Sequence, residues 1–370
     1  MGQWEGTLES LAISPEFWRG RRVFLTGHTG FKGSWLSLWL QRLGATLTGY
    51  ALAAPTDPSL FEQARVAEGM TSIQGDIRDL EALIRAMRAA GPEIIIHMAA
   101  QPLVRYSYQH PVETYATNVL GTVHVLEAAR ATPGLKAALC VTSDKCYDNH
   151  EGSGAHREGD PMGGHDPYSS SKGCAELVCA AYRASFFNPQ TYAQHGVALA
   201  SVRSGNVIGG GDWAPDRLVP DIVRAFAQRR PVEIRNPHAV RPWQHVLEAL
   251  RGYLMLSERL VLEGAALGEG WNFGPEAADA KSVGWIVEET AGRWGRGAEW
   301  RICAGDHPHE AGCLRLDIAK AGDRLGWRPR IGLSEALDLT FDWYQQQADG
   351  ADARLLTSRQ IADYQARWGR

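Results

Sequence analysis

The sequence predicts an α/β fold in which a doubly wound parallel Rossmann sheet carries a smaller C-terminal substrate-binding lobe. Three observations predict it. A glycine-rich turn joins a short apolar strand to an apolar helix, further strands alternate with helices of about ten or more residues, and glycine, proline, arginine and tryptophan become frequent after about residue 205. We therefore expect an N-terminal extension over residues 1–20, a dinucleotide-binding Rossmann domain over 21–204, and mainly the lobe over 205–370, with segments that can return to the Rossmann domain.

The first strand, turn and helix form one βαβ unit. Residues 21–26 are a short apolar run that ends at a glycine, and they predict the first strand. Apolar residues at helical spacing follow from Trp35 to Leu43, and Gly44 is placed to end that helix. Residues 45–50 predict the second strand.

The same alternation continues along the chain. The run Ile94–Ile96 is typical of a strand that is buried on both faces of a parallel sheet. The further strands expected are 71–74, 93–97, 137–141 and 197–202, and the helices between them are 80–90, 112–130 and 168–183. Beyond residue 205 we expect shorter elements, such as a helix over 221–228 and a strand over 232–234.

Composition excludes several classes of protein. The net charge of −4 over 370 residues argues against a nucleic-acid partner or a polybasic membrane anchor. The six cysteines form no C-x-x-C pair and no cluster with zinc spacing, so we expect reduced thiols and no metal. We find neither a signal peptide nor an apolar run of membrane-spanning length, and we expect a cytoplasmic protein.

The glycine-rich turn has the spacing of a phosphate-binding loop. It lies after a strand and opens a helix, where backbone N–H groups and the helix dipole attract a pyrophosphate. Glycine lets the backbone approach that group closely, although a purely structural turn is the alternative. The cofactor-binding candidates here are Gly27, Thr29, Gly30, Phe31, Lys32 and Gly33.

The second strand does not end in the acidic residue that usually binds the adenosine ribose. Asp57 comes several residues late, and no arginine stands ready for an NADP phosphate, so the sequence favours NAD. Asp76, after the third strand, is the other acidic candidate for the adenosine. The alternative, that Asp76 caps the next helix, is weaker because Asp79 is the better cap.

Tyr168 and Lys172 stand four residues apart on a predicted helix and therefore share one face. A free phenol has a pKa of about 10, and a nearby ammonium together with a positive nicotinamide would lower that pKa. Such a phenol could remove a proton from a sugar hydroxyl. The same spacing also occurs by chance in many helices, but here the pair follows a strand that ends at 141–143.

The spacing G-x-x-G-x-x-G resembles the extended branch of the short-chain dehydrogenase/reductase superfamily. The resemblance implies that Ser143 completes a triad with Tyr168 and Lys172 and bonds the reacting sugar oxygen; a strand-end cap is the alternative. For Asn118 and His97 a buried structural role stays open. The resemblance adds as cofactor-binding residues Asp76, Ile77, Ala99, Ala100, Gln101, Asn118, Thr142, Tyr168 and Lys172.

Two ionisable residues, Asp144 and Lys145, follow Ser143 directly. An oxidoreductase or epimerase has no need of them, whereas a dehydratase must also move a proton from C5 and one to the departing C6 hydroxyl. The pair resembles the nucleotide-sugar 4,6-dehydratases, and within them the branch that acts on CDP-glucose; the dTDP branch has Asp-Glu. The resemblance implies Asp144 as the acid at the C6 oxygen and Lys145 near C5. A salt bridge to Asp144 or a phosphate contact is the alternative for Lys145.

The resemblance extends over nearly the whole chain from about residue 17. It rests on the segments 26–33, 142–147, 168–172, 203–213, 216–220, 241–247 and 271–275, with 309–311 extending it. One departure is Ala249, where the family pattern has a proline after the glutamate.

The implied reaction is the NAD-dependent conversion of CDP-D-glucose to CDP-4-dehydro-6-deoxy-D-glucose and water, which feeds 3,6-dideoxyhexose synthesis for bacterial surface polysaccharides. Arg217 and Arg241 are the phosphate candidates because guanidinium groups make forked contacts with phosphate oxygens. Asn206 is expected at the sugar or first phosphate, with Leu218 and His245 also at the substrate. Solvated surface charges and, for His245, core packing are the alternatives.

Two rival functions remain open. One is another nucleotide-sugar 4,6-dehydratase or a 4-epimerase for a dTDP or UDP sugar, and the other is a catalytically inactive NAD-binding protein. The intact Tyr168–Lys172 pair argues against the second. The resemblance also implies a homodimer or homotetramer in which the helices 112–130 and 168–183 form a four-helix bundle.

Overall fold

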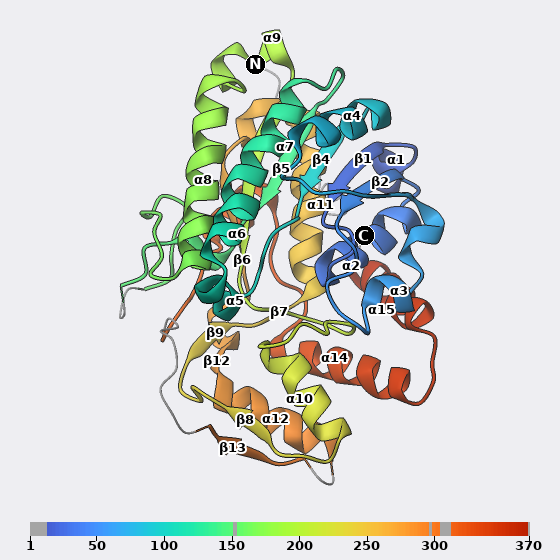
Figure 1. The fold of residues 1–370 in the computed structure, drawn as a ribbon, viewed down its shortest axis with the longest axis vertical. Coiled ribbons are helices and arrows are strands. Elements are labelled where there is room, and N and C mark those ends of the chain that lie inside the picture. The colour runs from blue at the N-terminus through green and yellow to red at the C-terminus, as the bar shows by residue number, and fades with distance from the viewer. Residues whose placement is uncertain (1–12, 151–153, 296–297, 304–311, 369–370) are drawn as a thin grey trace.

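A computed structural model describes residues 13–150, 154–295, 298–303 and 312–368 of the chain. Figure 1 shows the Rossmann unit in its upper part and the lobe below it. The strands are β1 (Arg22–Thr26), β2 (Thr46–Ala51), β3 (Thr71–Gln74), β4 (Ile94–His97), β5 (Ala137–Val141), β6 (Ala198–Ser204), β7 (Val207–Ile208), β8 (Val232–Ile234), β9 (Val240–Pro242), β10 (Gln244–His245), β11 (Gly270–Phe273), β12 (Ala280–Ser282) and β13 (Trp300–Ile302). The α-helices are α1 (Pro15–Trp18), α2 (Phe31–Arg42), α3 (Leu60–Gln63), α4 (Leu80–Ala90), α5 (Val104–Gln109), α6 (Pro111–Tyr115), α7 (Gly121–Arg130), α8 (Pro167–Ser185), α9 (Tyr192–His195), α10 (Leu218–Ala227), α11 (Val246–Glu263), α12 (Val283–Trp294), α13 (Ala319–Leu325), α14 (Leu333–Ala348) and α15 (Ala353–Trp368).

The central sheet confirms the predicted fold class. Its seven parallel strands have the order β11-β6-β5-β4-β1-β2-β3. The order reverses between β1 and β4, and in such sheets ligands bind at that point, beyond the carboxyl ends of the strands. The glycine-rich turn follows β1 and therefore lies at this edge of the sheet.

Alternating side chains of the strands fill two separate apolar layers. Leu25 and Ile96 belong to the larger core on the side of α2 and α11, whereas Phe24 and Ile95 belong to the core on the side of α4 and α7. This is the period of two that a β-strand imposes on its side chains. The central strands β4 and β5 are buried along their whole length because both faces of the sheet are covered there.

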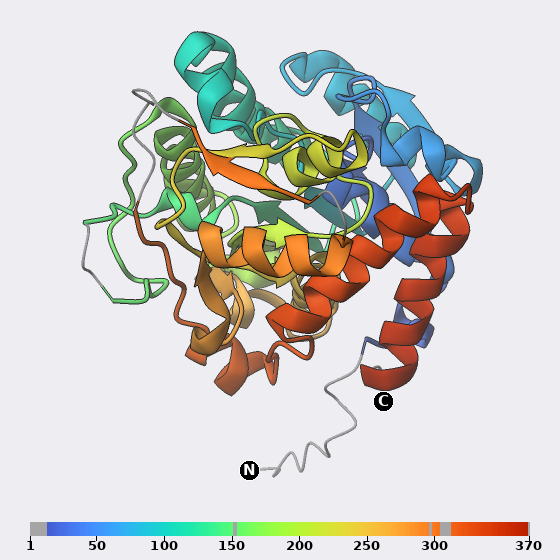
Figure 2. The ribbon, with the colours of Figure 1, turned by 90° about the horizontal axis from the view of Figure 1, so that it is seen from below.

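The lobe is built from two-stranded ribbons and helices. The ribbons pair β7 with β10, β9 with β12, and β8 with β13. Figure 2 shows α12 beside α14, and α15 next to α14 along one side of the molecule. The chain beyond residue 205 also returns to the Rossmann unit, because α11 packs on β5 and β6, and β11 pairs with β6 as an edge strand.

Two local differences from the predicted elements stand out. The extension expected to be irregular contains α1, whose Trp18 is fully buried, while residues 1–12 lie outside the described residues. The helix expected over 112–130 is interrupted by a π-helical turn, η3 (Ala116–Leu120), which carries the buried Asn118.

The segment 309–311 also lies outside the described residues. Within the described part of the chain, no helix combines the length and apolar character that crossing a bilayer requires.

Candidate active site

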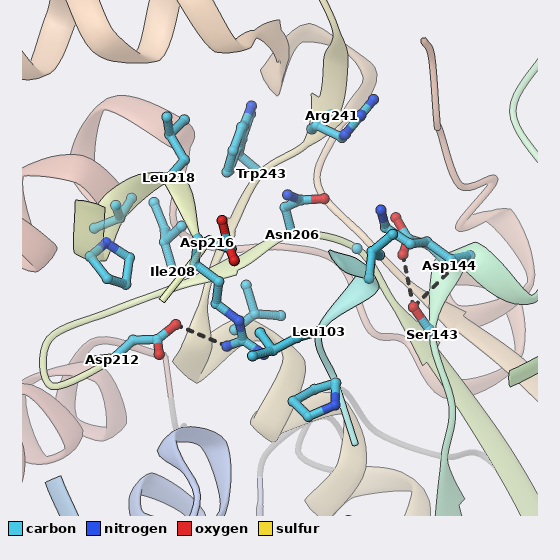
Figure 3. Close-up of a pocket in the computed structure, with 18 of the residues that line it drawn as sticks. Leu103, Ser143, Asp144, Asn206, Ile208, Asp212, Asp216, Leu218, Arg241 and Trp243 are labelled. Carbon is cyan, nitrogen blue, oxygen red and sulfur yellow. Dashed lines mark hydrogen bonds and ion pairs between the residues drawn. The ribbon is translucent and has the colours of Figure 1, made fainter. Parts of the chain in front are cut away.

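A cavity of about 580 Å³ lies between the carboxyl ends of the central strands and the lobe. The Rossmann unit contributes the segment Val141–Lys145 after β5, together with Tyr168 and Lys172 on α8. The lobe contributes the start of α10, the segment after β8, and Arg241 and Trp243 (Figure 3). The strand ends, one helix face and the lobe thus converge on a single space, which has the size of a small-molecule site.

Two glycines of the glycine-rich turn, Gly27 and Gly33, leave no room for a Cβ atom. A Cβ on Gly27, whose φ is +78°, would lie 2.7 Å from the Ala99 nitrogen, and one on Gly33 would lie 2.1 Å from the Gly27 oxygen. Gly30 is the N-cap of α2 and offers no side chain to the first-turn N–H groups. Phe31 and Lys32, in that first turn, line the cavity. This bare backbone at a helix N-terminus fits the pyrophosphate of a dinucleotide.

The predicted adenosine contacts lie away from the cavity. Asp76 forms an ion pair with Arg78 at 2.6 Å, and Ile77 packs in the core beside Gly121. Asp79 caps α4 by accepting a hydrogen bond from the Ala82 nitrogen, which confirms the assignment of the cap. The structure therefore keeps Asp76 at the end of β3, half-exposed and already paired.

The segment after β4 is held by buried polar side chains. Asn118 accepts a hydrogen bond from the Gln101 nitrogen at 2.8 Å and donates to the Gln101 oxygen and to Ser171 Oγ on α8. The Ala99 nitrogen donates to Thr26 Oγ1, and Ala100 lines the cavity. His97 is buried among hydroxyl groups, and burial lowers its pKa to about 3, so its ring is neutral. Asn118 and His97 thus have the structural role that was left open.

Tyr168, Lys172 and Ser143 line the same cavity, and the phenol is buried. Burial raises the pKa of Tyr168 to about 12, an effect that the Ser143 hydroxyl partly offsets. Lys172 Nζ donates instead to the Val141 oxygen at 3.4 Å, and burial, with the charge of Lys32, lowers the pKa of Lys172 to about 8. Desolvation outweighs the charge of Arg217 on the phenol. The expected lowering of the Tyr168 pKa includes the positive charge of a bound nicotinamide and stays a prediction.

Asp144 is a buried carboxyl group in the 3₁₀ turn η4 (Asp144–Cys146). Its Oδ1 accepts a hydrogen bond from Ser143 Oγ at 3.1 Å, while its Oδ2 is buried without a hydrogen-bond partner among the described residues (Figure 3). Burial raises the pKa of Asp144 and favours its protonated form. Lys145 lines the same cavity, and its positive charge opposes the effect of burial on the pKa of Asp144. No ion pair between the two side chains is found within the described ranges, and the alternatives for Lys145 stay open.

A buried carboxylate that the sequence argument missed stands behind these residues. Glu176, one helical turn after Lys172 on α8, accepts hydrogen bonds from Thr142 Oγ1 (2.5 Å), Ser201 Oγ (2.7 Å) and Arg203 Nη2 (2.7 Å). It thereby ties α8 to the ends of β5 and β6. The i, i+4 spacing from Lys172 was the available signal. Thr142 was expected at the cofactor. It lines the cavity, and its hydroxyl donates a hydrogen bond to Glu176.

On the lobe side, four of the five residues expected only at the substrate line the cavity. They are Asn206, Arg217, Leu218 and Arg241. Arg217 forms an ion pair with Asp212 at 2.9 Å. His245 is the exception and a correction: it is fully buried, accepts a hydrogen bond from the Leu247 nitrogen as the N-cap of α11, and packs edge-on against Trp35. Burial lowers its pKa to about 3, so the core-packing alternative holds.

The cavity is positively charged although the chain has a net charge of −4. Seven cationic and five acidic side chains line it, a formal balance of +2. The cationic ones are Lys32, Arg105, Lys145, Lys172, Arg217, Arg235 and Arg241, and the acidic ones are Asp144, Asp212, Asp216, Asp221 and Glu233. Such a balance suits a dianion such as a diphosphate diester. No group of three metal-ligating side chains occurs among the described residues.

Comparisons with known proteins agree with this geometry. The family model described as GDP-mannose 4,6 dehydratase matches residues 24–340. The chain is 57% identical over 352 residues to the CDP-glucose 4,6-dehydratase of Salmonella typhimurium, covering 95% of this chain and 98% of that protein. It is 28% identical over 313 residues to the dTDP-glucose 4,6-dehydratase of Streptomyces antibioticus, covering 81% of each. The structure of MoeE5 in complex with UDP-glucose and NAD superposes with a TM-score of 0.74 at 25% identity, covering 88% of this chain and 99% of that one.

Proposed function

The chain belongs to the GDP-mannose 4,6-dehydratase family, and on this premise we propose that it is an NAD-dependent hydro-lyase that converts CDP-D-glucose to CDP-4-dehydro-6-deoxy-D-glucose and water. One observation carries the proposal: Tyr168, Ser143, Asp144 and Lys145 line a single cavity, beside the dinucleotide-shaped turn, in a chain that is 57% identical to a CDP-glucose 4,6-dehydratase. The product would supply 3,6-dideoxyhexose synthesis for bacterial surface polysaccharides.

The residues present fit a bound NAD. The backbone N–H groups at the start of α2 would hold the pyrophosphate, with the side chains of Phe31 and Lys32 beside it. Asp76, with the backbone of Ile77, would face the adenosine, and the segment Ala99–Gln101, held by Asn118, would lie along the cofactor. When bound, the nicotinamide accepts a hydride from C4 of the hexose and returns it to C6, and its positive charge favours the phenolate of Tyr168.

Tyr168 would take the proton from the C4 hydroxyl, and Ser143 would hold that oxygen by a hydrogen bond. The buried setting leaves the phenol protonated at neutral pH, since its pKa is about 12. A proton acceptor at this position therefore depends on positive charge close to the ring. Lys172 supplies part of this charge from the same helix face and Arg217 from the lobe, because both line the cavity.

Asp144 and Lys145 would carry out the loss of water. Once C4 is a ketone, the C5 hydrogen is acidic. The unprotonated amine of Lys145 would accept that proton and return it to C5 when the hydride reaches C6. Asp144 would give its proton to the departing C6 oxygen, a role that requires a neutral carboxyl group. Burial supports this role because it raises the Asp144 pKa and leaves Oδ2 without a hydrogen-bond partner within the described residues.

The lobe would hold the nucleotide. Arg217 and Arg241 would contact the diphosphate, Asn206 the sugar or first phosphate, and the start of α10 at Leu218 the nucleotide. A formal balance of +2 in the cavity supports a ligand with two negative charges.

We further propose a cytoplasmic homodimer or homotetramer. The six cysteines carry free thiols, which suits a reducing compartment. Large apolar side chains are exposed along α6, η3 and α8, namely Val112, Tyr115, Leu120, Leu177 and Phe186. A four-helix bundle with a second copy would bury them. A monodisperse monomer in solution scattering would contradict this assembly.

Incubation with CDP-, dTDP- and UDP-glucose plus NAD tests the function, with the 4-keto product detected by its absorbance in alkali. We expect turnover of CDP-glucose. Turnover of dTDP- or UDP-glucose without turnover of CDP-glucose would refute the assignment of cytosine as the nucleobase of the substrate. Absence of any 4-keto product would refute the proposed dehydratase activity.

A further inference from the structure

A single carboxylate joins the Rossmann wall of the cavity to the lobe wall. Asp216 Oδ1 accepts hydrogen bonds from Arg105 Nη1 on α5 and from Arg235 Nη1 just after β8, both at 3.0 Å. All three side chains line the cavity (Figure 3 labels Asp216 among the surrounding residues). Neither arginine was singled out by the sequence.

The backbone at Asp216 is unusual. Its φ is +58°, in the left-handed region that glycine adopts far more readily than other residues. A side chain kept at such a position is often there for what its functional group does. Here the carboxylate is the group that the two guanidinium groups share.

The ion pairs of Asp216 with Arg105 and Arg235 are partly exposed to solvent, and the three side chains together carry a net positive charge. The exposed fractions of the three side chains are 40% for Arg105, 37% for Asp216 and 28% for Arg235. Exposed ion pairs of this kind stabilise a protein only weakly, so exchanging the partner costs little. Two guanidinium groups against one carboxylate leave a formal charge of +1, which attracts a further anion.

We propose that Arg105 and Arg235 form a further anion subsite for the diphosphate of the nucleotide sugar, and that Asp216 occupies this subsite until the diphosphate displaces it. The proposal rests on the function proposed above, because it presumes a nucleoside diphosphate ligand. A diphosphate brings two charges and more acceptor oxygens than a carboxylate, and guanidinium groups bind such oxygens in pairs. Since one arginine belongs to α5 and the other to the lobe, the bound diphosphate joins the two walls.

The test is calorimetric binding of CDP and of cytidine to the NAD-loaded enzyme. Arg105→Gln and Arg235→Gln should each weaken CDP binding about tenfold, the loss of one charge-assisted contact, and should leave cytidine binding unchanged. Asp216→Asn should act in the opposite direction and tighten CDP binding, because it removes the competing charge and asparagine tolerates a positive φ. Arg324→Gln is the matched control, since Arg324 is an exposed arginine paired with Glu269, neither residue lines the cavity, and the change should leave CDP binding unaltered.

Unchanged CDP affinity in both arginine variants would overturn the subsite, and so would an equal loss of cytidine affinity. Unchanged or weaker CDP binding by Asp216→Asn would overturn the displacement. NAD content and thermal unfolding of each variant show whether it is folded. Titration of UDP and dTDP in parallel separates the anion subsite from the proposed preference for CDP-glucose. If either nucleotide binds more tightly than CDP but depends equally on Arg105 and Arg235, the preference for CDP is refuted and the subsite is supported.

Discussion

The two walls of the cavity hold their charges in different ways. Directly behind the Rossmann wall, the ion pair of Arg203 with Glu176 is buried, with exposed fractions of 5% and 4%. On the lobe wall, Arg217 in its pair with Asp212 is 33% exposed, and Arg235 in its pair with Asp216 is 28% exposed. The wall proposed to carry the chemistry is thus fixed before substrate arrives, whereas the wall proposed to bind the nucleotide keeps its cations in pairs that an anion can exchange.

Burial also sets the protonation states on the Rossmann wall. It raises the pKa of Asp144 and of Tyr168 and lowers that of Lys172, so each group is driven toward its neutral form. Neutral groups that change state only when substrate and cofactor are bound are useful in a site that must move several protons in order.

The largest expected effect is on the Rossmann wall. Tyr168→Phe removes the proposed acceptor of the C4 hydroxyl proton without changing the size of the ring, and we expect kcat to fall about 10³- to 10⁴-fold. Affinity for CDP-glucose should change little, because the loss is in the chemical step. Steady-state kinetics with equilibrium binding as the control checks both, and near-normal kcat would remove Tyr168 as the base.

Next comes the buried pair that supports this wall. Glu176→Gln leaves the charge of Arg203 buried without its counter-charge, and we expect the free energy of unfolding to fall by about 3–5 kcal/mol. The double variant Glu176→Gln/Arg203→Met should recover part of this loss. Arg301→Gln in the lobe should cost less than about 1 kcal/mol. Denaturant unfolding measures all three, and equal losses in Glu176→Gln and Arg301→Gln would erase the contrast between the walls.

Asp144→Asn sharpens the comparison within one wall. The amide cannot donate a proton to the C6 oxygen, and we expect release of the 4-keto-6-deoxy product to slow about 10²- to 10³-fold. Oxidation at C4 should persist, so reduced cofactor should accumulate on the enzyme and be visible by its absorbance. Dehydration at the normal rate would refute the acid role of Asp144.

On the lobe wall the same kind of change should affect binding. Arg217→Met should raise KM for CDP-glucose about tenfold through the lost diphosphate contact. It should also lower kcat by less than about tenfold, because Arg217 lowers the pKa of Tyr168. Initial rates over a range of substrate concentrations test this. A fall in kcat at unchanged KM would place Arg217 with the catalytic residues instead.

The smallest effect concerns a buried carboxyl group without a buried cation. Glu258 on α11 accepts a hydrogen bond from the Ser14 nitrogen, and burial raises its pKa from 4.5 to about 7. A raised pKa means that the folded state binds the proton more tightly than the unfolded state. The contribution of Glu258 to stability is therefore present below about pH 4.5 and is lost as the pH rises through about 7. Glu258→Gln should flatten this part of the unfolding profile, and an unaltered slope would contradict the raised pKa.

Local pattern was enough to predict most of the sheet. The bounds expected for β3, β5 and β8 are those observed, because apolar runs between turn residues define buried strands. The resemblance implied that Ser143 meets Tyr168 and Lys172, and these three residues line one cavity. Burial could not be predicted from local pattern, so the sequence did not show that desolvation raises the pKa of Tyr168 or that His245 lies in the core. Asp216 escaped notice because its partners stand 111 and 19 residues away along the chain.

The return of the chain to the sheet at β11 decides how this molecule could be divided. The strand that pairs with β6 comes from Gly270–Phe273, so the lobe is not a contiguous appendage. A fragment that stops near residue 204 would lose α11 and expose β6 as a bare, apolar sheet edge, which promotes aggregation. Exchanging nucleotide preference with a relative by grafting a whole lobe would therefore need several joints, on either side of α11 and β11, rather than a single splice.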